Sequence, residues 1–183
     1  MRWKNEILGI VVVCALLILN GSFYSVGYNY CAVTLRLGKV TGVVGPNRWC
    51  FKLPLIDDYV PISTQIRTRM FKVQAVSRDH QTAVLLVSVS FRVPLNQADS
   101  LYTRYGSLKA LEDRLITRSV DRQSKATFAK LNASYAVLNQ ADLARKMAQS
   151  IKTSMSGQPI QIVNIQLEGI GYSSPDMEIA KAG

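Results

Sequence analysis

The clearest pattern in the chain is an alternation of apolar and polar residues from Thr82 to Val93, which predicts a β-strand. Pro94 ends the pattern, because proline cannot donate to a strand ladder. The second face of this strand is apolar at its start and polar at its end, which is typical of a strand that is half covered. The first face would be wholly apolar: Ala83, Leu85, Val87, Val89, Phe91 and Val93.

The longest hydrophobic run, Ile7–Leu19, is interrupted only by Gly9. By itself it is shorter than the roughly 20 residues that a membrane-spanning helix needs. Aromatic residues flank it, as in interfacial belts, and Trp3 to Tyr24 would span about 31 Å of helix. We therefore predict a retained single-pass anchor over residues 1–26. Headgroup contact is predicted at five aromatic residues: Trp3, Phe23, Tyr24, Tyr28 and Tyr30.

A cleaved signal peptide is the competing interpretation of this run. Arg2 and Lys4 could form its basic start, but the best cleavage site after Leu19 is only Gly21-Ser22. Basic residues lie on both sides of the run, so the positive-inside rule does not decide the orientation.

Turn residues organise the next part of the chain. Gly45-Pro46-Asn47-Arg48 suits a type II turn with Asn47 at positive φ. Strands are predicted on either side, at Cys31–Leu37 and Cys50–Leu53. Pro54 and Pro61 bracket Leu55–Val60, which predicts a short edge strand or loop, and Ile62–Val76 is predicted to be mostly extended.

The second half is predicted to be largely helical. Asn96 could cap a short helix that Gly106 ends, and Ser107 could cap the next. Tyr135–Met155 is predicted as a third helix and Pro159–Gly169 as a returning strand. The helix after Ser107 has apolar residues at helical spacing: Leu108, Leu111, Leu115, Ile116, Val120 and Phe128.

The same helix would carry a basic face formed by Arg114, Arg118, Arg122 and Lys125. Two interpretations stay open: an ordinary solvated face, or a contact with a neighbouring subunit.

The order of these motifs resembles the stomatin/prohibitin/flotillin/HflK–HflC superfamily, whose shared domain is called SPFH or band 7. The resemblance rests on the order of turns and strands in Leu35–Arg69, including Phe51-Lys52-Leu53-Pro54-Leu55-Ile56-Asp57-Asp58. It continues in Arg104-Tyr105-Gly106 and Leu111-Glu112-Asp113-Arg114-Leu115. It covers roughly residues 26–179 and is closest in character to bacterial HflC/prohibitin-like membrane proteins. One departure is Asn47, where the family usually has glycine.

The resemblance implies an α+β fold in which an N-terminal transmembrane helix precedes a two-part SPFH domain. A β-rich SPFH1 subdomain would span residues 27–94 and a mixed α/β SPFH2 subdomain residues 95–174. Residues 175–183 would start the C-terminal helix, so either the sequence is part of a longer protein or this is a short form.

The resemblance also implies an oligomeric membrane scaffold, in which copies of this chain or of a related SPFH chain form a ring or cage. Such an assembly would organise a membrane microdomain and enclose or regulate a membrane-bound AAA protease. It implies a bacterial inner-membrane location with an extracytoplasmic domain. Candidate subunit contacts are Arg114, Arg118 and Arg122, together with Leu85 and Val87 of the alternating strand. The alternative is an anchored adaptor that binds a lipid or a single membrane protein.

The net charge bears on which class of partner the protein binds, and the cysteine content bears on whether disulfides hold the fold. Lys and Arg number 22 against 12 Asp and Glu, giving a formal charge of +10. The basic residues are spread along the chain without a nucleic-acid-binding motif, so anionic headgroups explain the excess better than nucleic acid does. Three cysteines are too few for a disulfide framework. Cys31 and Cys50 could pair in an oxidising compartment or could remain reduced.

No enzyme, metal site or cofactor is predicted. The single histidine, His80, follows Asp79 in a polar turn, and a hydrolase would also need a positioned nucleophile such as Ser77 or Ser90. Adjacent carboxylates such as Asp57 and Asp58 diverge on a strand, and the glycines form no phosphate-binding loop.

Overall fold

The computed structural model describes residue 3 and residues 22–172. The predicted anchor run and the predicted start of a C-terminal helix lie outside the described residues. Within the part that is described, no helix is both long and apolar enough to cross a membrane. The described residues form two compact units. Unit 1 comprises the residues up to Gln65 together with Pro94–Arg104, and unit 2 comprises Ile66–Val93 and the residues from Tyr105 onward.

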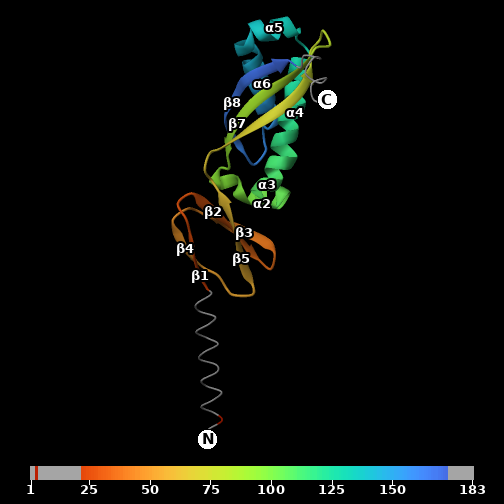
Figure 1. Ribbon diagram of the computed structural model, residues 1–183. Coiled ribbons are helices and arrows are strands. Elements are labelled where there is room, and N and C mark those ends of the chain that lie inside the picture. Colours follow the sequence, from red (N-terminus) through yellow and green to blue (C-terminus); the bar gives the residue numbers. More distant parts are fainter. Residues whose placement is uncertain (1–2, 4–21, 173–183) are drawn as a thin grey trace, which may run out of the picture. The chain divides into compact units, whose positions relative to one another are not determined.

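Unit 1 is built from two small antiparallel sheets (Figure 1). The first pairs β1 (Phe23–Val26) with β4 (Arg48–Phe51). The second has the order β3-β2-β5, with β2 at Tyr30–Arg36, β3 at Lys39–Val44 and β5 at Asp57–Ser63. A 3-10 turn (Leu95–Gln97) leads into α2 (Ala98–Tyr105), which ends at Gly106 with φ 75°.

The core of unit 1 lies where the two-stranded ribbon packs against the three-stranded sheet. Tyr24 and Val26 of β1 are buried with Ala32 of β2, and Val44 and Cys50 pack against them. The Tyr24 ring also stacks on Tyr59 of β5, at 4.1 Å between centroids and 4° between planes. Because strand residues alternate between faces, Phe23 and Ser25 point away from this core.

Two turns set the course of the chain in unit 1. Asn47 has φ 54° and its amide donates to the Val26 carbonyl at 2.9 Å, which confirms the predicted turn. The β2–β3 hairpin turns at Leu37 and Gly38, with φ 49° and 77°. β3 lies between the predicted strand Cys31–Leu37 and the predicted turn at Gly45, where no strand was predicted from the sequence; its Gly42 lies in the ladder opposite Thr34.

Unit 2 contains a three-stranded antiparallel sheet of order β6-β7-β8 and a set of helices. The strands are β6 (Arg67–Val76), β7 (Thr82–Arg92) and β8 (Gln161–Tyr172). The helices are α3 (Leu108–Leu111), a π-helical turn (Glu112–Ile116), α4 (Thr117–Phe128), α5 (Ala133–Leu138) and α6 (Gln140–Ser154).

The core of unit 2 confirms the alternation on β7. All six residues of the predicted apolar face are buried. α4 contacts β6 and α6, and α6 contacts β8. The helices contribute buried residues on one face, mostly at steps of four residues or a multiple of four: Leu111, Ile116, Val120, Phe128, Leu143, Met147 and Ile151.

The structure divides the chain differently from the predicted boundary at residue 94. β6 and β7 were assigned to the first subdomain, but they pair with β8 and therefore belong to unit 2. Sequence alone could not show this, because β7 and β8 are separated by the whole helical segment.

Two helix boundaries were also predicted wrongly. Asn96 lies inside the 3-10 turn, which follows Pro94, so it does not cap α2. The third helix is broken at Asn139, whose φ of −121° and ψ of 46° separate α5 from α6. Ser107 is confirmed as a cap, since its hydroxyl accepts from the Ala110 amide at 3.1 Å.

The burial of β7 also corrects two predicted subunit contacts. Leu85 and Val87 lie in the core of the protomer, on a central strand whose two edges are paired with β6 and β8. Neither side chain can therefore reach a second subunit in this fold.

Candidate membrane-facing site

One end of unit 1 gathers the start of β1, the end of β4, the β2–β3 turn and the loop that precedes β5. Phe23 is paired with Phe51, and their rings meet edge-to-face at 5.6 Å. From Phe51 the chain runs through residues 52–56 into β5, whose Asp57 is opposite Arg36. The Leu37 amide of the hairpin donates to the Ile56 carbonyl at 2.9 Å, which joins the hairpin to the loop.

Six large apolar side chains at this end are exposed to solvent. We call this set the apolar end of unit 1: Phe23, Leu37, Phe51, Leu53, Leu55 and Ile56. Leu55 is fully exposed, and Leu37 is 76% exposed. A soluble surface would normally carry polar residues at such loop tips.

Two leucines of the apolar end have unfavourable backbone conformations. Leu37 has φ 49° and Leu55 has φ 72°. A residue with a Cβ in this region costs roughly 1–2 kcal/mol, and glycine or asparagine avoids the cost. Leucine at both tips is thus unfavourable for the isolated unit in water, which favours a role in contact with an apolar medium.

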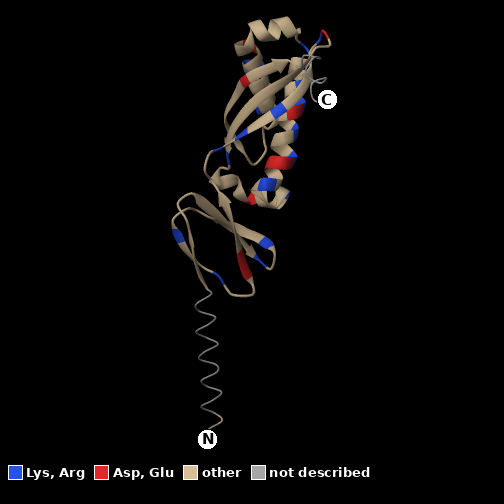
Figure 2. Ribbon diagram, in the orientation of Figure 1, with Lys and Arg blue, Asp and Glu red and all other residues tan. Residues whose placement is uncertain are grey.

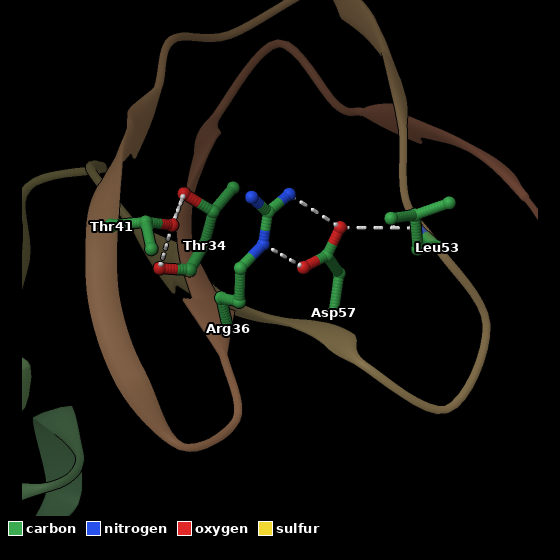
Figure 3. Close-up of polar contacts among 5 residues, drawn as sticks. All are labelled: Thr34, Arg36, Thr41, Leu53 and Asp57. Carbon is green, nitrogen blue, oxygen red and sulfur yellow. Dashed lines mark hydrogen bonds and ion pairs between the residues drawn. The ribbon is translucent and has the colours of Figure 1, made fainter.

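Hydrogen bonds of Asp57 with Arg36 and Leu53 connect the hairpin that ends at Leu37 to the loop that carries Leu55 (Figure 3). The Arg36 guanidinium donates from Nε and Nη2 to the two oxygens of Asp57, at 2.8 and 3.1 Å. Asp57 Oδ2 also accepts from the Leu53 amide at 3.1 Å. The hydrogen bond from Arg36 is the larger cause, and the hydrogen bond from the Leu53 amide the next, of a lowered pKa of Asp57. The Asp57 carboxyl is therefore ionised at neutral pH.

The hairpin has a second tie next to these hydrogen bonds. The Thr41 hydroxyl donates to the Thr34 carbonyl at 3.1 Å (Figure 3). The Thr34 hydroxyl donates to the Gly42 carbonyl at 3.0 Å. Both leucine tips therefore project from a hydrogen-bonded frame.

The structure retains only part of the predicted aromatic belt. Phe23 belongs to the apolar end, and the Trp3 side chain is exposed. Tyr24 was predicted wrongly, because its ring is buried in the core of unit 1. Tyr28 and Tyr30 are exposed but lie at the other end of β2 from Arg36, about 20 Å away along a seven-residue strand. Those two tyrosines cannot share one headgroup layer with the apolar end while β2 runs along the membrane normal.

Sequence reasoning missed five residues of the apolar end, although a signal was present. Leu55 and Ile56 follow Pro54 in a segment too short and too proline-rich for a buried strand. An apolar loop between two prolines could have been interpreted as a surface tip. Leu37, Phe51 and Leu53 gave no such signal, because each belongs to a run predicted as a strand.

The predicted basic face lies on the π-helical turn and α4 of unit 2. Arg114, Arg118 and Arg122 are exposed, and they make no ion pair within the described part of the chain. Figure 2 shows basic positions in blue along α4. Lys125 is paired with Asp121 at 2.9 Å. The three arginines remain available to a partner or to solvent.

The polar turn around His80 has a structural role. His80 is exposed at φ 60°. Asp79 accepts from the Ser77 hydroxyl and from the Ala133 amide, the latter at 3.0 Å, and so holds the start of α5. These bonds, from Ser77 and then from Ala133, lower the pKa of Asp79. The Asp79 carboxylate is therefore engaged with α5.

Other candidate chemistry is sparse. Within residues 22–172, Cys31 and Cys50 are free thiols. No group of three or more metal-ligating side chains is found in the part of the chain that the structure describes.

The fold and the apolar end define an α+β domain with a candidate lipid-facing surface. The model of the SPFH domain / Band 7 family matches residues 24–182, so the chain belongs to this family. Among curated protein sequences, a search found no match to the chain. Proteins of this family are generally membrane-associated scaffolds.

Proposed function

We propose that this protein is an oligomeric membrane scaffold that rests on the bilayer through the apolar end of unit 1. The observation that carries the proposal is the set of six exposed apolar side chains at the point where β1 begins. The predicted anchor run Ile7–Leu19 precedes β1 in the sequence. An anchor helix that leads into β1 would bring this end to the headgroup layer.

The energetics favour such contact. Burying a large apolar side chain contributes about 1.5–3 kcal/mol, and partial insertion of several side chains adds to the effect of the anchor. The positive φ of Leu37 and Leu55 is the same in either medium, so the gain on insertion comes from removing their exposed side chains from water. Lys39, next to the hairpin tip, would face anionic headgroups.

Quenching of tryptophan fluorescence by brominated lipids tests this contact. The full-length chain is reconstituted in vesicles, with Trp3 and Trp49 replaced by Phe so that one introduced tryptophan reports. Leu55→Trp places the reporter at the apolar end, and Tyr28→Trp places it at the opposite end of unit 1 as a matched control. We expect severalfold stronger quenching for Leu55→Trp; equal quenching of the two would reject the proposed contact.

The specific form of the proposal is a ring or cage in which the copies, or a related SPFH chain, surround a membrane patch. The assembly would enclose or regulate membrane proteins such as an AAA protease. Its location would be a bacterial inner membrane, single-pass, with the domain outside the cytoplasm. The arginine face formed by Arg114, Arg118 and Arg122 is a proposed contact with a neighbouring subunit or partner, since it is exposed and unpaired among the described residues.

The second candidate is an anchored adaptor that binds one membrane protein or lipid. The apolar end would serve a scaffold and an adaptor equally well, because it accounts for contact with the membrane and says nothing of assembly. An adaptor would give a small complex of fixed stoichiometry, whereas a scaffold would give large particles without any partner.

A further inference from the structure

The sheet of unit 2 has two outer strands, β6 and β8, and each carries an edge of backbone groups. β7 lies between them and is paired on both sides. Within residues 22–172, no third strand pairs with the outer edge of β6 or of β8. An edge of this kind is a template for a strand from another chain.

β8 is an unusually open edge. It runs for 12 residues, Gln161–Tyr172, and contains no lysine, arginine or proline. Natural edge strands are normally short or carry such residues to prevent pairing. Two register irregularities interrupt its ladder with β7, and its one charged residue is Glu168. Most of its side chains are exposed or half-buried.

β6 has the opposite character. Arg67, Arg69 and Lys72 lie along this strand. The first two face the buried Glu112, at 3.7 and 3.5 Å. Lys72 is exposed, and it makes no ion pair with an acidic residue in the described part of the chain. The β6 edge is therefore basic, whereas the β8 edge is weakly acidic.

The register places the unpaired charges of the two edges at one level of the sheet. Lys72 is opposite Leu86, and Leu86 is opposite Gly169, the residue after Glu168. The two charged residues are two strand spacings apart, roughly 10 Å between backbones, with β7 between them. They form no ion pair within the protomer, and each is left without an opposite charge.

We propose that β8 of one copy pairs with β6 of the next copy, so that the sheet continues from protomer to protomer. This proposal rests on the proposed oligomeric function and assigns its interface. A head-to-tail contact of two different edges repeats from copy to copy, and it gives a ring when the rotation between copies closes on itself. Rotation about an axis along the strands keeps Lys72 of the next copy at the level of Glu168, the extra residue at a register shift of β8. The contact would therefore bring the two unpaired charges close together.

A charge exchange tests this interface in the full-length chain extracted in mild detergent. Glu168→Lys and Lys72→Glu each place like charges across the contact, and each should raise the concentration for half-assembly on the order of tenfold. The combined variant restores opposite charges and should recover wild-type assembly. Lys152→Glu, an exposed charge change of the same kind on α6, is the matched control and should have no effect.

Disulfide trapping tests the same β8–β6 contact independently, in case a charge variant fails to fold. Lys72→Cys and Glu168→Cys are combined in one chain, with Cys14 and Cys50 replaced by Ser. The roughly 10 Å within a protomer exceeds the roughly 7 Å limit for a disulfide, so only pairing between copies can form the bond. We expect a ladder of covalent multimers on oxidation, and no covalent dimer from either single cysteine.

The outcomes separate this inference from the proposed function. A large wild-type assembly with no ladder, or with single variants that assemble normally, overturns the β8–β6 contact and leaves the scaffold function standing. A covalent dimer from Glu168→Cys alone indicates β8–β8 pairing and also overturns it. A wild-type chain that runs as a monomer overturns both.

Discussion

Leu85→Ala is expected to lower the free energy of unfolding of unit 2 by about 2–5 kcal/mol. The Leu85 side chain is 0% exposed, in the middle of the central strand β7, and its removal leaves a cavity that surrounding side chains fill only partly. The measurement is denaturant unfolding followed by circular dichroism in mild detergent.

Leu86→Ala is the matched control for this change, since the neighbouring side chain points to the other face and is only half-buried. It should cost clearly less than Leu85→Ala. If Leu85 were a subunit contact, Leu85→Ala would weaken assembly while leaving unfolding unchanged, and that result would contradict the fold described here.

Tyr24→Ala is expected to destabilise unit 1 by about 3–5 kcal/mol, the usual cost of truncating a buried aromatic side chain. The ring is 7% exposed and loses both its stacking on Tyr59 and its contacts with Val26 and Ala32. Tyr28→Ala, at a side chain that is 77% exposed, should change stability by less than about 0.5 kcal/mol. Equal effects of the two substitutions would contradict the placement of Tyr24 in the core.

The same tyrosine gives unit 1 a dependence on alkaline pH. Burial is the larger cause, and a hydrogen bond with Cys50 the next, of a rise in the pKa of Tyr24 from 10.0 to about 12. The folded state thus favours the neutral phenol. The contribution of neutral Tyr24 to the free energy of unfolding is complete below about pH 10 and is lost as the pH rises towards 12. Tyr24→Phe should remove this part of the alkaline transition, as followed by unfolding at several pH values.

Much of the secondary structure could be predicted from local sequence. β7 followed from alternation, the Asn47 turn from proline and asparagine chemistry, and the Ser107 cap from the preference of serine for helix starts. Each of these signals acts over a few residues. The pairing of β7 with β8, which fixes the limits of unit 2, is a contact across the whole helical segment, and no local pattern encodes it.

The candidate site was predicted less completely, because exposure depends on strand register. Phe23 and Tyr24 are adjacent and chemically similar, yet alternation on β1 points one outward and the other into the core. A shift of one residue in register would exchange their roles. Leu37 and Leu55 lie in turns with positive φ. Turns of this kind are usually recognised by glycine or asparagine at that position, so two leucines gave no sign of them.

The size of the full-length chain in mild detergent tests the central claim most directly. Mass photometry together with negative-stain images would report the particles at micromolar concentration and below. An oligomeric scaffold predicts ring- or cage-shaped particles many times the 20.3 kDa of one chain. A single species at the mass of one chain plus its detergent would contradict the account.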